Sequence, residues 1–431
     1  MAEIKPFRGF RYNQQKVKPE EVITLPYDKI SPSLQEEYYL RSPYNMVRLI
    51  LGKQEPTDTE TNNRYTRARD FLQQWEKQKV LMQEKLDAIY LYDQHYMIPG
   101  TEIRRVRRSF IAALKLEDFE SGVVRPHERT LPKAKADRIN LLRAIETHPE
   151  LIFMMYEDPQ KKVSQLLGPL VSHHSAFDFQ DDQGVRNRLW VITDPDAIEQ
   201  VKAIMKDKTL FIADGHHRYE TAITLKKEHE NNSNPSKFAY AMMAFTNLSE
   251  EGLTVLPTHR IVKNKPGLNK ETFLKECGNI FDIQKQETIT ALFDVLAKRA
   301  SEHALGAYFG KGEFYSLVLK DKGAIEKLVR KGIPAPVANL DVTLLHELLL
   351  EEKLGITKEE IAAEVALGYC RDKNRGVEEV DAAKAQVSFF LNPTLPKQVQ
   401  EVCLAGHVLP QKSTDFFPKL LSGLVLHKLE V

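Results

Sequence analysis

The densest set of chemically capable side chains in this sequence is the run Asp214-Gly215-His216-His217-Arg218. The four apolar residues before it, 210–213, predict a short buried strand, and the apolar residues after it recur with helical spacing. The run should therefore lie at a strand-to-helix turn, where the first N–H groups of the helix and its dipole favour an anion.

The residue types at this turn suit phosphate. Glycine lets the backbone approach a ligand closely, the guanidinium of Arg218 offers a planar fork of donors, and histidines can donate near neutral pH. We predict that Gly215, His216, His217 and Arg218 bind the phosphate groups of a nucleotide. The alternative is an ordinary Asp-Gly turn followed by polar loop residues.

Two further segments carry acid–base groups. Residues 124–133 hold His127 and Glu128 between prolines, which discourage regular structure, so we expect a stiff functional loop. His127, Glu128 and Asp137 could hold Mg²⁺ or take a proton. Tyr27 and Asp28 follow a strand predicted over residues 22–25, where site residues are common. A solvated loop and a simple turn are the alternatives.

Two segments nearer the C-terminus could bind anions. His259 and Arg260 lie in a polar cluster at the end of a strand predicted over residues 253–262. Lys412 and Ser413 lie in a proline-flanked loop, where the lysine could meet a phosphate and the hydroxyl could cap a helix or coordinate a metal-bound phosphate. No glycine-rich loop precedes them, so they do not form a P-loop. Ordinary polar loops are the alternative.

The elements that must position these residues mix strands and helices along the whole chain, which indicates an α+β fold. The patterns predict a strand over residues 44–51, a polar linker over 54–63 and an amphipathic helix over 64–79. The four arginines within residues 104–108 fit a solvated strand face better than a basic patch. Residues 305–309 and 314–319 flank Gly310-Lys311-Gly312 and predict a hairpin.

Composition narrows the class of protein. The 61 basic and 60 acidic residues give a net charge of +1, which argues against a nucleic-acid-binding protein. The three cysteines are odd in number and far apart, which favours a reducing cytoplasm over a disulfide framework. The N-terminus does not read as a signal peptide, and no apolar run approaches membrane-spanning length. We expect a cytoplasmic protein with neither nucleic acid nor membrane as partner.

Several motifs, in one order from end to end, resemble the domain-of-unknown-function family number ten-fifteen. They are Phe7-Arg8-Gly9-Phe10-Arg11-Tyr12, Leu25-Pro26-Tyr27-Asp28, Ser42-Pro43-Tyr44-Asn45, Pro126-His127-Glu128-Arg129-Thr130, Ala213-Asp214-Gly215-His216-His217-Arg218-Tyr219, Thr254-Val255-Leu256-Pro257-Thr258-His259-Arg260 and Leu409-Pro410-Gln411-Lys412-Ser413-Thr414. The turn at residues 214–218 also resembles the ParB/sulfiredoxin-like nucleotide-binding motif. It is most similar to the Asp-Gly-His-x-Arg block of free-serine kinases, with His217 at the variable position.

The resemblance implies an α+β fold with a ParB/sulfiredoxin-like nucleotide-binding core over residues 1–265. It further implies an inserted α+β subdomain over 266–335 and a C-terminal segment, 336–431, that completes the core. The implied activity is a kinase that phosphorylates free L-serine with ATP or ADP and Mg²⁺. Its partners would be small molecules, an amino acid and a nucleotide, and a homodimer is left open.

The resemblance also assigns roles to residues. In those kinases the block holds the nucleotide phosphates, its aspartate is tied to catalysis, and an acidic base comes from the N-terminal region. Here this implies catalytic roles for Asp214 and His216, with Asp28 and Glu128 as candidate bases and Asp214 and Glu128 as Mg²⁺ ligands. The expected substrate-binding residues are Tyr27, His127, Thr130, Arg260, Lys412 and Ser413.

Two other classes of function remain open from the sequence. One is a nucleotide-binding or nucleotide-hydrolysing regulatory module, as ParB relatives can be. The other is a metal-dependent hydrolase that uses His127, Glu128, Asp137 and the pair His216 and His217.

Overall fold

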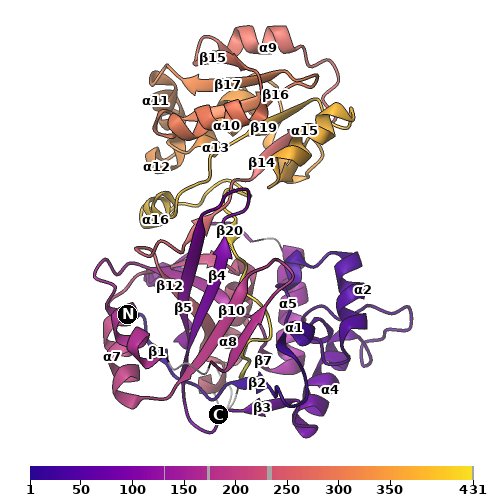
Figure 1. Cartoon of the computed structure of the whole chain (residues 1–431), viewed down its shortest axis with the longest axis vertical. Helices are drawn as coiled ribbons and strands as arrows, with labels where there is room; N and C mark the ends of the chain where they lie inside the picture. The colour runs from indigo at the N-terminus through magenta and orange to yellow at the C-terminus, as the bar shows by residue number, and fades with distance from the viewer. Residues whose placement is uncertain (131, 172–174, 231–234, 430–431) are drawn as a thin grey trace. The chain divides into compact units, whose positions relative to one another are not determined.

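The computed structural model describes residues 1–130, 132–171, 175–230 and 235–429, and it divides into two compact units (Figure 1). The first unit comprises residues 1–254 and 418–431, and the second comprises residues 255–417. Residue 131, within the loop predicted over 124–133, lies outside the described residues. None of the described helices has both the length and the apolar character that crossing a lipid bilayer requires.

The first unit is built on a mixed sheet of nine strands in the order β6-β11-β8-β12-β5-β4-β10-β9, with β1 paired to β5. The pairs β11·β6 and β12·β8 are parallel, and the other pairs are antiparallel. The strands are β1 (Ile4–Lys5), β4 (Ile89–Met97), β5 (Arg104–Lys115), β6 (Val124–Arg125), β8 (Ile152–Tyr156), β9 (Phe177–Gln180), β10 (Arg186–Ile192), β11 (Leu210–Asp214) and β12 (Tyr240–Asn247).

A hydrophobic core of the first unit lies between this sheet and the helices α6 (Lys162–Leu167), α7 (Pro195–Met205) and α8 (His216–Glu228). The Asp194 side chain accepts a hydrogen bond from the Ala197 N–H and so caps α7, and Pro195 suits the first helical position. Stacked Phe110 and Phe245, with ring centroids 4.8 Å apart, join β5 to β12 inside the core. Residues of both β11 and α8 are buried in this core, so apolar burial holds the two elements together.

The N-terminal part of the first unit is mostly helical, and its helices gather to one side of the sheet (Figure 1). They are α1 (Pro19–Val22), α2 (Pro32–Arg41), α3 (Val47–Ile50), α4 (Arg64–Lys77) and α5 (Pro132–Ile145). Helix α5 packs against both α4 and α8, which links this region to the helix that follows the predicted turn. Two short sheets, β2 (Phe10–Tyr12) with β3 (Leu81–Gln83) and β7 (Thr147–His148) with β21 (His427–Lys428), complete the unit.

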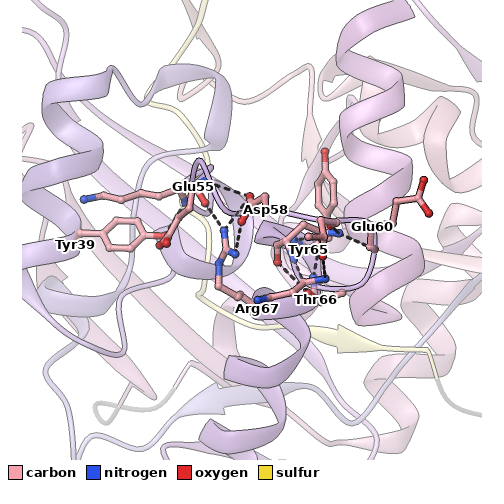
Figure 2. A network of polar contacts seen from close by, with 11 residues as sticks. Tyr39, Glu55, Asp58, Glu60, Tyr65, Thr66 and Arg67 are labelled. Atoms are coloured by element: carbon pink, nitrogen blue, oxygen red, sulfur yellow. Dashed lines mark hydrogen bonds and ion pairs between the residues drawn. The ribbon is translucent and has the colours of Figure 1, made fainter.

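The stretch predicted as a polar linker, residues 54–63, is an ordered loop held against α4. Arg67 makes two hydrogen bonds to the Asp58 carboxylate, at 2.5 and 3.1 Å, and a third to the Lys53 carbonyl at 2.8 Å (Figure 2). Asn63 and Thr66 form a capping box at the start of α4. The polar side chains of the loop therefore have structural partners: Asn63 caps the helix start and Asp58 binds Arg67.

The second unit has its own antiparallel six-stranded sheet, in the order β15-β17-β16-β19-β14-β18. The strands are β14 (His259–Val262), β15 (Phe281–Gln286), β16 (Ala304–Tyr308), β17 (Phe314–Leu319), β18 (Leu367–Cys370) and β19 (Val387–Phe390). The helices are α9 (Lys270–Cys277), α10 (Ile289–Lys298), α11 (Gly323–Arg330), α12 (Ala335–Ala338), α13 (Asp341–Leu344), a π-helix (Leu345–Glu351), α14 (Lys358–Ala362), α15 (Lys373–Asp381) and α16 (Pro396–Leu404). Strands β13 (Thr254–Val255) and β20 (Phe416–Phe417) lie at the two chain boundaries between the units.

The structure confirms the α+β class and the hairpin, which is β16 and β17. The division of the chain differs from the predicted boundaries at 265 and 335. Strands β14, β18 and β19 lie outside 266–335 but pair in the same sheet as β15 to β17, so all of residues 255–417 form one unit. The chain returns to the first unit only at Pro418.

Three local predictions were wrong. The strand predicted over residues 22–25 is not formed, because Val22 ends helix α1 and Thr24 makes only an isolated bridge to Ser422. The strand predicted over residues 44–51 is the helical turn α3, which begins at Val47 after a turn in which the buried Asn45 side chain accepts from the Val47 N–H. A short apolar run cannot by itself distinguish a buried strand from a buried helical turn. Among the arginines of residues 104–108, Arg107 does not lie on a solvated face, because it is 0% exposed.

Candidate functional site

The predicted strand-to-helix turn is confirmed. Strand β11 ends at Asp214, Gly215 has φ 92° and ψ 29°, and α8 begins at His216. A side chain on Gly215 would be strained in this left-handed conformation, and its Cβ would lie 3.0 Å from the Nε and Nη2 atoms of Arg218. Glycine therefore allows both the sharp turn and the return of the Arg218 guanidinium over it. We call residues 214–218 the elbow.

The Asp214 carboxylate lies among cations. The Lys419 ammonium is 2.9 Å from its Oδ2 atom, and the Arg218 Nη2 is 3.7 Å from its Oδ1 atom. Burial alone would raise the pKa of Asp214, but the charges of Lys419, Arg218 and Lys29 outweigh burial and hold the pKa far below its ordinary value. Asp214 is therefore ionised at every physiological pH, and its side chain is still 24% exposed.

The Arg218 guanidinium is fixed from several directions. Its Nη1 donates to the Leu151 carbonyl. Burial would lower the pKa of Arg218, but the nearby Glu150, Asp214 and Asp28 carboxylates raise it above the ordinary value. The guanidinium therefore remains charged and braced beside the first turn of α8.

His216 and His127 form a buried pair rather than two exposed donors. Their rings are nearly perpendicular, with centroids 4.6 Å apart, and the side chains are 6% and 1% exposed respectively by residue. His216 Nε2 accepts from the His127 backbone N–H at 3.2 Å, and His127 Nδ1 donates to the Ile212 carbonyl at 2.6 Å. Burial lowers the pKa of His127 to about 4 and that of His216 well below its ordinary value, so both rings are neutral.

The other imidazole of the elbow, His217, is half-buried near three acidic residues. Burial lowers the pKa of His217, while the charges of Glu128, Glu220 and Asp28 oppose that shift. This places the predicted bases Asp28 and Glu128 within electrostatic reach of the elbow, although they are 100 positions apart in the sequence. Thr130 joins the same region because its hydroxyl donates to both carboxylate oxygens of Glu220 at 2.9 Å.

Glu150 holds the loop that carries Tyr27 and Asp28 in place. The Tyr27 N–H donates to Glu150 Oε1 at 3.1 Å, and the Arg138 guanidinium lies 3.9 Å from the centre of the Tyr27 ring. Arg138 in turn lies 3.3 Å from Glu150 Oε2 and bonds Asp137, which also accepts from Tyr65 at 2.8 Å. Asp137 is thus occupied by structural partners.

Sequence reasoning missed Lys419, Glu150 and Arg138 as part of this site. Arg138 lies in a segment whose pattern indicates only a helix, and Glu150 lies just before a segment whose pattern indicates only a strand. Lys419 lies 205 positions after Asp214, in an apolar C-terminal segment with no motif around it. A single buried lysine among apolar residues was the one available signal, because such a charge needs a partner.

The predicted substrate-binding residues Arg260, Lys412 and Ser413 belong to the second unit, where they lie close together. The Arg260 guanidinium is 1% exposed and bonds His346 Nε2 and the carbonyls of Thr258, Gln411 and Lys412. Ser413 donates to the Pro410 carbonyl at 2.5 Å, and Lys412 is exposed with φ 55°. Arg260 therefore serves to hold the loop at residues 410–413.

In the part of the chain that the structure describes, no group of three or more His, Cys, Asp or Glu side chains is arranged to hold a metal ion. Asp214 offers one ionised carboxylate next to the helix N-terminus. Mg²⁺ commonly binds through one or two carboxylates and the phosphates of its substrate. The donors present therefore fit a Mg²⁺ ion brought by a nucleotide, not an ion held by the protein alone.

The chain was compared with solved structures and with curated proteins. A variant of free serine kinase in complex with AMP is 13% identical, with a TM-score of 0.36, over 74% of this chain and 90% of that chain. A conserved hypothetical protein from Pyrococcus furiosus is 14% identical (TM-score 0.33, 69% and 89%), and SbnI from Staphylococcus aureus with a C-terminal truncation is 11% identical (TM-score 0.32, 70% and 82%). TM-scores this low do not establish a shared fold, and no curated protein matched.

The family comparison covers most of the chain. The family described as "Protein of unknown function (DUF1015)" matches residues 4–343, which include the elbow and the loops at residues 27–28 and 127–130. This agrees with the motifs that resemble that family from one end of the sequence to the other. The chain belongs to the family of proteins of unknown function DUF1015.

Proposed function

We propose that this protein is a nucleotide-dependent small-molecule kinase that transfers a phosphoryl group from ATP or ADP to the hydroxyl of free L-serine. The observation that carries the proposal is the elbow itself. An ionised carboxylate, two cations and the N-terminus of a 13-residue helix converge at one turn that is partly open to solvent. Phosphoryl transfer depends on positioning and charge neutralisation, and such a turn supplies both.

The phosphates would bind at the start of α8. Its first N–H groups and dipole favour negative charge, and the guanidinium of Arg218 lies over Gly215. His216 is neutral and buried, so it would stabilise the conformation of the turn rather than contact phosphate. His217, which is half-buried, is the imidazole of the pair that would reach the ligand.

The proton of the serine hydroxyl needs an acceptor other than Asp214. A carboxylate whose pKa is held far below neutrality is a poor base, so the role of Asp214 would be electrostatic. Asp28 is exposed and Glu128 is partly exposed, and both act on His217. One of them would take the proton while the serine oxygen bonds the phosphorus and the bond to the nucleotide's leaving oxygen breaks. Mg²⁺, brought by the nucleotide and held with help from Asp214, would neutralise phosphate charge.

The test is a direct assay of the products. Purified protein is mixed with Mg²⁺, free L-serine and either ATP or ADP, and phosphoserine is measured by phosphorus NMR or mass spectrometry. Asp214→Asn should lower turnover by about 100-fold or more, which is typical for the loss of one transition-state electrostatic group. Asp178→Asn, which removes a carboxylate paired with Arg186 on an edge strand of the same sheet, is the matched control and should keep full turnover.

Two results would contradict the proposal. Full turnover in Asp214→Asn would remove the elbow carboxylate from the reaction. Nucleotide hydrolysis in which neither serine nor any other acceptor is phosphorylated would favour a nucleotide-hydrolysing regulatory module instead.

A further inference from the structure

The last residues of the chain return to the first unit after the whole of the second unit has intervened. Segment 418–429 is almost entirely buried there. Ser422 and Thr24 exchange backbone hydrogen bonds at 2.8 and 3.1 Å, and Leu426 and Phe10 do the same at 2.9 Å. The segment is therefore an internal strut of the first unit rather than a tail.

Two buried side chains hold the start of this segment. Gln94 Nε2 donates to the Lys419 carbonyl at 3.0 Å, and Arg107 Nη2 donates to the Pro418 carbonyl. Arg107 also donates to Gln94 Oε1, and Gln94 is 0% exposed within a cluster that includes Asn187 and Tyr92. Strands β4, β5 and β10 thus supply a buried polar cluster that fixes the positions of residues 418 and 419. We call Gln94 and Arg107 the bracket.

The bracket positions residue 419 so that its ammonium lies beside Asp214 of the elbow. The side chain is 9% exposed, and its Nζ lies 2.9 Å from Asp214 Oδ2. The Arg218 Nη2 is a second cation near this carboxylate, 3.7 Å from Asp214 Oδ1. Asp214 therefore lies between two cations, Lys419 and Arg218, and Lys419 brings its charge to the turn where α8 begins.

We propose that Lys419 is a phosphate-binding residue of this site, that it donates to a phosphate oxygen of the nucleotide while it orients Asp214, and that Gln94 and Arg107 position it. The inference rests on the proposed function, because it names a further residue for the same ligand. The ligand chemistry is a chain of phosphates, which a compact ammonium recognises by charge. Lys419 thereby makes the C-terminal segment a part of the binding site.

The test compares three variants by isothermal titration calorimetry with ADP, with inorganic tripolyphosphate and with adenosine. Lys419→Met removes the charge, Lys419→Arg keeps it, and Lys428→Met removes a different buried-segment lysine, whose Nζ lies 2.7 Å from Glu76. Hydrogen bonds to charged groups predict that Lys419→Met weakens ADP and tripolyphosphate by a similar factor, about tenfold or more, and leaves adenosine unchanged. Lys419→Arg should retain most of the affinity, and Lys428→Met all of it.

Thermal unfolding of each variant shows whether it has folded, and Lys419→Arg keeps the test usable if Lys419→Met does not fold. Wild-type affinity for tripolyphosphate in folded Lys419→Met would overturn the inference while the proposed function stands. Equal weakening toward adenosine and tripolyphosphate would also overturn it, because the loss would then come from a loosened site. If the wild-type protein binds neither ADP nor tripolyphosphate, the proposed function fails as well.

Discussion

The neutral state of the buried imidazole of His127 predicts how the first unit responds to acid. In the folded protein the pKa of His127 is about 4, because burial disfavours the charged ring, whereas an unfolded histidine titrates near 6.5. Between these two values the unfolded chain binds more protons than the folded chain. The neutral ring of His127 therefore contributes fully to the free energy of unfolding above pH 6.5, and this contribution is lost as the pH falls from 6.5 toward 4.

The magnitude follows from the two pKa values. At pH 5 the unfolded His127 is almost fully protonated and the folded one is almost fully neutral. Linkage then gives a loss of about 2 kcal/mol relative to pH 8 from this residue alone. His127→Asn removes the titration and keeps a donor for the Ile212 carbonyl, so its stability should depend less on pH by that amount.

The assay is urea unfolding followed by tryptophan fluorescence at pH 8 and at pH 5. Both tryptophans of the chain, Trp75 and Trp190, are buried in the first unit, so the signal reports on that unit. The stability gap between wild type and His127→Asn should close by about 2 kcal/mol on going to pH 5. His407→Asn, at an exposed position in the second unit, is the control.

The refuting result is a gap that stays constant between the two pH values. It would mean that His127 binds protons equally in the folded and unfolded chains, so the ring would be charged in the folded site at pH 5. His127 and its partner His216 could then donate to an anion, and their place as neutral structural groups would be wrong.

Three further outcomes follow from the same geometry. Gly215→Ala should cost about 1–2 kcal/mol of unfolding free energy, because alanine is strained in the left-handed conformation. It should also weaken ADP binding in calorimetry, because the added Cβ presses on Arg218, and unchanged ADP affinity would contradict this. Glu150→Gln should cost about 3 kcal/mol in urea unfolding, since it leaves Arg138 short of a buried partner and loosens the Tyr27 loop, whereas a loss below 1 kcal/mol would show that Asp137 alone compensates Arg138. Arg67→Met should cost only about 1 kcal/mol in the same assay, because its pair with Asp58 lies near the surface, and a loss as large as that of Glu150→Gln would refute this ranking.

Local patterns were sufficient for the elbow. A buried strand, a glycine turn and a helix follow one another within a few residues, so propensity and apolar spacing determine the geometry of residues 210–228. The hairpin β16–β17 was predictable for the same reason, because its turn residues lie between its strands. The segment at residues 44–51 was not, because its apolar residues satisfy a strand and a buried helical turn equally well.

The placement of the remaining site residues depended on long-range packing. The sequence alone identified Tyr27, Asp28, Glu128 and Thr130 as polar residues in loops, but not that Glu150 and Glu220 would hold two of these loops beside the elbow. It also offered both histidines of the elbow as exposed donors. Burial of His216 against His127 made one of them a neutral acceptor, and burial is a property of the packed molecule rather than of a motif.

By itself, then, the amino-acid sequence determined the class of fold, the family and the turn at residues 214–218, since each of these depends on neighbouring residues or on short motifs in order. Only the tertiary structure decided which charges surround Asp214. Lys419 reaches that carboxylate through a C-terminal segment bracketed by Gln94 and Arg107, and electrostatic interactions depend on distance and burial, not on separation along the chain.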